Sequence, residues 1–138
     1  MTELFSKYRV VVVMATLVTI SFCFSGWAAD KEAIEKQIKK QVDEVVAAID
    51  GGKKVEDFKI LATKEPYHIF VMEQGGKILL HPSLEGDDMK SQYRASYDAV
   101  IKGTDEGLWV EYEYFGKMKR TYVKKTRGGL IVGSGYSD

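Results

Sequence analysis

The pattern of apolar and polar residues predicts one α+β domain that follows an apolar N-terminal stretch. Over Lys31–Asp50, apolar residues recur every three to four positions, which is the spacing of one helix face, and Gly51-Gly52 predicts the helix end. Val55–Thr63 allows a further short helix, which Pro66 ends. From Tyr67 onward the period changes to that of strands.

The second half of the chain predicts a β-hairpin, a second amphipathic helix and a three-stranded meander. Asp87 or Asp88 caps this helix, and Gly103 ends it. The five predicted strands are Tyr67–Met72, Lys77–His81, Leu108–Phe115, Met118–Lys125 and Leu130–Tyr136. Because short turns join antiparallel neighbours, we expect a five-stranded antiparallel sheet with both amphipathic helices packed on it. The hairpin and the meander are expected to meet through the first and last strands.

The first 29 residues have the anatomy of a secretory signal peptide. Lys7 and Arg9 precede the apolar run Val10–Phe24, and small residues follow up to Ala29. We therefore expect a signal peptide over residues 1–29 and one periplasmic or secreted domain over residues 30–138. The alternative is an uncleaved anchor that faces the periplasm, because Val10–Ala29 holds 20 uncharged residues, enough to cross a bilayer.

Composition excludes several classes of function. From Asp30 onward there are 18 Lys plus Arg and 19 Asp plus Glu, so the basic excess typical of nucleic-acid binding is missing. Cys23 is the only cysteine and lies in the predicted signal peptide, which leaves the domain without a disulfide or a cysteine-based metal site. The two histidines have no metal-ligand spacing, and no nucleophile motif is present. We predict no cofactor, no metal and no catalysis.

Four segments in sequence order are similar to one known family. They are Tyr67–Pro82, with its Gly turn and closing His-Pro, then Gly107–Tyr112 (Gly-Leu-Trp-Val-Glu-Tyr), Lys119–Lys125 (Lys-Arg-Thr-Tyr-Val-Lys-Lys) and Leu130–Tyr136, which ends in Gly-Ser-Gly-Tyr. This order resembles the type-2 single Cache domain, an extracytoplasmic ligand-binding module with a PAS-like sheet. Such a resemblance implies sensing of a small molecule, often a short organic acid, on behalf of a receptor or a kinase.

Two departures from the family limit what the resemblance implies. His68 stands where the family commonly has an aromatic residue, and no output domain follows Tyr136. We therefore expect a binding module whose partner is a membrane receptor or a second copy. The alternative is a structural or protein-interaction module that keeps the fold and binds no ligand.

A carboxylate ligand calls for a cation beside hydroxyl donors, within aromatic walls. The resemblance and this chemistry together name eight candidate ligand-binding residues: His68, His81, Arg94, Tyr97, Trp109, Tyr112, Lys119 and Tyr122. Strand alternation places Trp109 and Tyr112 on opposite faces, so one of the two is expected to face away from any single pocket. Glu111 and Glu113 share a strand face and are expected to be solvated carboxylates.

Overall fold

The structure, a computed structural model, describes residues 29–137 of a chain that divides into two compact units, Met1–Lys36 and Gln37–Asp138. Apart from Ala29, the predicted signal peptide lies outside the described residues. Within residues 29–137, no helix has both the length and the apolar character that crossing a membrane requires. In the first unit, residues 29–36 are helical.

The predicted first helix is confirmed, and its helical stretch is described over residues 29–50. In the second unit this helix buries one apolar stripe, including Ile38, Val42 and Val45, each at most 1% exposed. At its end, Gly52 adopts a φ of 103°, and the amide of Lys53 donates to the carbonyl of Ala48. This is a Schellman arrangement, which needs a left-handed residue and therefore favours glycine.

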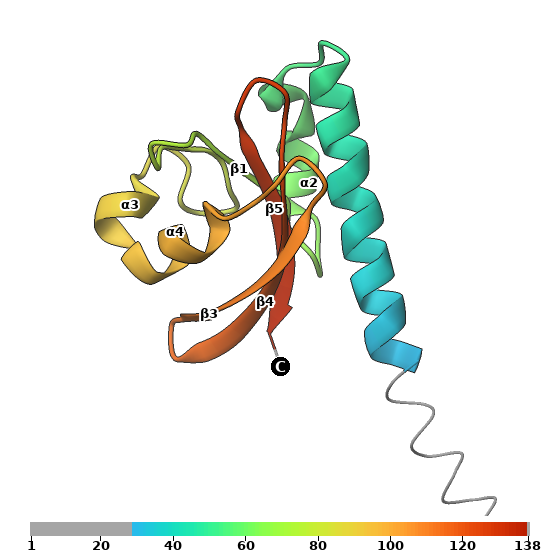
Figure 1. Cartoon of the computed structure of the whole chain (residues 1–138), viewed down its shortest axis with the longest axis vertical. Coiled ribbons are helices and arrows are strands. Elements are labelled where there is room, and N and C mark those ends of the chain that lie inside the picture. Colours follow the sequence, from blue (N-terminus) through green and yellow to red (C-terminus); the bar gives the residue numbers. More distant parts are fainter. Residues whose placement is uncertain (1–28, 138) are drawn as a thin grey trace, which may run out of the picture. The chain divides into compact units, whose positions relative to one another are not determined.

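The second unit is an α+β domain around a five-stranded antiparallel sheet, as predicted (Figure 1). Its sheet has the order β2-β1-β5-β4-β3, so the hairpin and the meander do meet through the first and last strands. The short helical segments before the sheet are η1 (Val55–Phe58) and α2 (Lys59–Thr63). The strands are β1 (Phe70–Met72), β2 (Ile78–Leu80), β3 (Leu108–Tyr114), β4 (Lys117–Lys125) and β5 (Ile131–Ser137).

The predicted second helix is two short helices, α3 (Met89–Gln92) and α4 (Arg94–Val100). Asp88 caps α3, because its carboxylate accepts from the amides of Lys90 at 2.9 Å and Ser91 at 3.3 Å. The break falls at Tyr93, whose φ of −135° and ψ of 59° are not helical. The apolar spacing continues across this one residue, which is why the pattern alone predicts a single helix.

Both faces of the sheet are covered, so the domain has apolar contacts on each side. Helix residues 37–50 lie along one face, and α3 and α4 lie on the other (Figure 1). On the α4 side, Met72, Val100 and Ile131 are fully buried in one apolar cluster. We call the two sides the helix face and the α4 face. Side chains that alternate along one strand therefore enter two different environments.

Candidate functional site

Strands β3 and β4 divide the predicted ligand-binding residues between the two faces of the sheet. Tyr112 pairs with Lys119, and Tyr112 belongs to the cluster packed against α4, which places both residues on the α4 face. Trp109 pairs with Tyr122, and the hydroxyl of Tyr122 reaches Asp43 on the helix at 3.2 Å. The predicted separation of Trp109 from Tyr112 is therefore confirmed.

On the α4 face, Lys119 is a partly buried cation without a carboxylate partner among the described residues. Its ammonium lies 5.2 Å from the centroid of the Tyr114 ring. Burial lowers the pKa of Lys119, because removing water disfavours the charged form. An anion that binds beside this partly buried ammonium would therefore stabilise its charged form.

His81 follows β2 and faces the same region. Its Nδ1 accepts hydrogen bonds from the amides of Ser83 and Leu84, each at 3.1 Å. Burial first, and then the charges of Lys119 and His68, lower the pKa of His81 to about 4. The ring is therefore neutral at pH 7, and since Nδ1 is the acceptor, Nε2 carries the proton. His81 has a structural role in its turn and still offers Nε2–H as a donor.

Tyr112 and Thr121 add hydroxyl groups to this face. The Thr121 hydroxyl donates to the Tyr112 oxygen at 3.1 Å. Burial raises the pKa of Tyr112 to about 12, so its phenol stays neutral at ordinary pH. Thr121 was not among the residues predicted from sequence, although it lies two positions after Lys119 and thus on the same face.

The strand between β1 and β4 carries glycines at this place, and neighbouring side chains pack directly against them. Strand β5 presents Gly133 and Gly135 to the α4 face, where they pair with Phe70 and Thr121. A Cβ on Gly135 would collide with the Thr121 hydroxyl, so the glycine permits the close approach that its sequence position suggested. His68 precedes β1 and lies close enough to His81 for its charge to act on that ring. We call His68, His81, Tyr112, Lys119 and Thr121 the lysine–histidine site.

His68 contributes one buried polar atom. Its Nε2 lies 3.3 Å from the Glu65 carboxylate. Its Nδ1 is buried and, among the described residues, has no hydrogen-bond partner. A buried polar atom without a partner costs free energy unless something binds it. An aromatic residue, as the resembled family has here, would not offer this atom.

The remaining predicted residues lie elsewhere. Arg94 is exposed on α4, where it forms an i,i+4 ion pair with Asp98 at 3.0 Å. Tyr97 is buried in the core, and its hydroxyl donates to the carbonyl of Gln74 at 2.7 Å. Trp109 lies on the helix face beside Tyr122, with 5.3 Å between ring centroids. The structure thus brings together four of the eight predicted residues: His68, His81, Tyr112 and Lys119.

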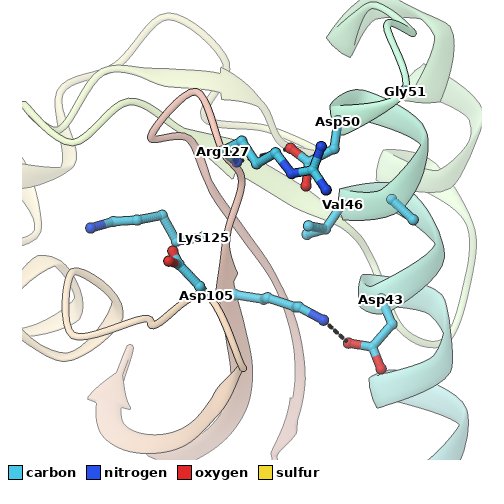
Figure 2. A pocket seen from close by; sticks show the side chains of 9 residues that line it. Asp43, Val46, Asp50, Gly51, Asp105, Lys125 and Arg127 are labelled. Carbon is cyan, nitrogen blue, oxygen red and sulfur yellow. Dashed lines mark hydrogen bonds and ion pairs between the residues drawn. The ribbon is translucent and has the colours of Figure 1, made fainter.

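A cleft of about 580 Å³ opens on the helix face (Figure 2). Its lining includes Asp43 and Asp50 from the helix, Asp105 from the loop before β3, Lys124 and Lys125 at the end of β4, and Arg127 from the turn after β4. The Lys124 ammonium pairs with Asp43 at 3.1 Å, and the Arg127 amide donates to Asp50 at 2.8 Å. The cleft also holds the side chains of Lys125 and Arg127, which form no ion pair within the described residues, so cations and carboxylates are mixed along its lining.

Acidic, histidine and cysteine side chains do not gather into a metal site anywhere in residues 29–137. A hollow of about 170 Å³ beside α4 is lined by Tyr93, Arg94 and Ser96 and by Tyr114, the ring that the Lys119 ammonium approaches. None of the five residues of the lysine–histidine site lines this hollow. The chemistry on the α4 face is therefore that of neutral donors and one ammonium, which suits binding of an anion.

Comparison with known proteins identifies the fold. No protein-family profile matches the chain, and no curated protein matches it. Four chains from solved structures do match. One is a methyl-accepting chemotaxis protein from Vibrio parahaemolyticus RIMD 2210633, with a TM-score of 0.53 and 20% identity over 77% of this chain and 89% of that one. The chain thus shares its α+β fold with this methyl-accepting chemotaxis protein.

Proposed function

We propose that this chain is an extracytoplasmic sensory domain of the single Cache type that binds a small carboxylate in the lysine–histidine site. The observation that carries the proposal is Lys119, a partly buried ammonium with no carboxylate partner among the described residues. The shared fold supports it, because the matched protein is a methyl-accepting chemotaxis protein. The partner is a membrane receptor or a second copy of the chain.

The site offers the groups that a carboxylate needs. Lys119 supplies the charge, and a charge-assisted hydrogen bond is roughly twice as strong as a neutral one. His81 supplies a neutral Nε2–H, and the hydroxyl pair of Tyr112 and Thr121 supplies one proton beyond the bond it already makes. A short organic acid fits this set better than a large or neutral ligand.

A thermal-shift and calorimetry screen tests the proposal. The protein is titrated with acetate, propionate, lactate and pyruvate, and with propionamide as a neutral match for propionate. A true ligand at about 100 times its dissociation constant stabilises the folded state by about 2.7 kcal/mol. We expect one or more acids to raise the melting temperature and propionamide to leave it unchanged.

Two variants separate the site from general charge effects. Lys119→Met keeps the length of the side chain and removes the ammonium, so we expect it to abolish the response to the acid. Lys117→Met, at an exposed position on the same strand, is expected to respond like the original protein. The proposal fails if no acid stabilises the protein, or if Lys119→Met responds as strongly as Lys117→Met.

A further inference from the structure

The two edge strands of the sheet differ in whether their outward backbone groups are hydrogen-bonded. At the β2 edge, the loop that follows the strand forms hydrogen bonds with these groups. The Ile78 amide donates to the carbonyl of Asp87 at 2.9 Å, and the Ile78 carbonyl accepts from the Gly86 amide at 2.9 Å. At the β3 edge, no backbone bond from outside the sheet reaches residues 108–114 within the described chain. Strand β3 is therefore the edge that stays open.

The open edge has few of the features that block pairing with another strand. All seven residues of β3 pair with β4 in continuous register, from Leu108 opposite Val123 to Tyr114 opposite Lys117. The strand contains neither proline nor a bulge, two common protections of an edge. In an antiparallel ladder, alternate residues direct their amide and carbonyl outward. Strand β3 thus presents a row of donors and acceptors longer than that of β2.

The side chains along this edge indicate the chemistry of a matching strand. On the helix face, Glu111 and Glu113 are both exposed. Glu111 pairs with Arg120 at 2.9 Å, while Glu113 has no ion-pair partner in residues 29–137. On the α4 face the strand carries Leu108, which is 39% exposed, while Val110 and Tyr112 are buried in the cluster that packs against α4. An added strand therefore meets carboxylates on one side and, at Leu108, an exposed apolar group on the other.

We propose that the outer edge of β3 binds an extended segment of a partner protein, in which basic residues alternate with apolar ones, as a sixth strand. The backbone ladder supplies affinity, and the two faces supply specificity, as in other cases of strand addition. Opposite charges directly across a strand pair stabilise it, and like charges destabilise it. A second copy of β3 would bring two more glutamates to the edge, so a basic strand is the better occupant.

A designed peptide tests this edge in the full chain. The probe is a capped peptide of the same length as β3, in which valine alternates with lysine. We expect it to slow hydrogen exchange of alternate β3 amides about tenfold, because these amides become bonded. Amides of β2 should exchange at an unchanged rate. Two control peptides are expected not to bind: one has glutamate in place of lysine, and one has N-methylated backbone groups that cannot pair.

Variants of the protein complete the test. Glu113→Lys is expected to weaken binding of the lysine peptide about fivefold, since one favourable cross-strand pair is lost and one unfavourable pair is made. The matched control, Glu85→Lys, lies in the loop beside the covered β2 edge and should bind normally. Protection at β2, equal binding of the glutamate peptide, or self-association through β3 that the peptide does not compete with would each overturn the proposal.

Discussion

Acid should destabilise this domain through His81, and the effect can be isolated with one substitution. The pKa of His81 is lowered from 6.5 to about 4. Between these values the unfolded chain holds a proton on His81 that the folded chain does not. Because the unfolded state binds more protons, the free energy of unfolding falls as the pH is lowered through this window. Above pH 6.5 the contribution is complete.

The magnitude follows from the size of the pKa shift and the exposure of the ring. One pKa unit corresponds to about 1.4 kcal/mol, so the full shift of His81 is worth about 3 kcal/mol. The ring is partly exposed, and solvent screening reduces this to about 2 kcal/mol. The structural cause is direct, because a proton on Nδ1 would break both bonds from Ser83 and Leu84.

This prediction is checked by measuring the free energy of unfolding in urea, at several pH values, for the original protein and for His81→Asn. The asparagine oxygen can accept the same two amides as an Asx turn, but it does not titrate. Between about pH 7 and about pH 4.5, the original protein should lose about 2 kcal/mol more than the variant. The carboxylates common to both proteins cancel in the difference. Parallel pH profiles for the two proteins would refute the reasoning.

Two further predictions concern backbone positions. Gly107 has a φ of 95°, and a Cβ there would collide with the Tyr122 hydroxyl, so Gly107→Ala should cost about 2 kcal/mol in urea unfolding. Gly75→Ala, with open space around it, should change stability by less than about 0.5 kcal/mol, and a similar loss for both variants would contradict the assignment. Phe115 is 77% exposed with a φ of 49° in the two-residue turn between β3 and β4. Phe115→Asn should therefore raise the melting temperature by relieving about 0.5 kcal/mol of strain, and a lower melting temperature would show that its contacts with neighbouring rings outweigh that strain.

The order of elements could be predicted because local signals mark each boundary. Gly52 ends the first helix and Asp88 begins α3, and both act through neighbouring atoms only. The break at Tyr93 has no such signal, since neither glycine nor proline stands there. The predicted first strand is longer than β1 because Ile69 bonds the carbonyl of Leu61 instead of a sheet neighbour. That bond depends on the position of α2, which residue periodicity does not describe.

The candidate site was only partly predictable, for a geometric reason. Alternation separated Trp109 from Tyr112, but both sheet faces are covered, so it could not show which face holds the site. The pairing of Tyr112 with Lys119 depends on the register between β3 and β4, which the tight turn at Gly116 sets. Arg94 was predicted as the cation for a ligand, but its guanidinium already forms an ion pair with the nearby carboxylate of Asp98. Such pairing depends on where each side chain points in the folded chain.

Strand β4 connects the two faces of the sheet through its alternating side chains. Lys119 and Thr121 project to one side of this strand, while Tyr122 and Lys124 project to the other and hold Asp43 of the helix. Neighbouring residues of a strand share peptide planes and cannot tilt independently. A rotation of β4 that moved Lys119 and Thr121 would therefore also move the two groups that bond Asp43, so the α4 face and the helix are mechanically connected through this strand.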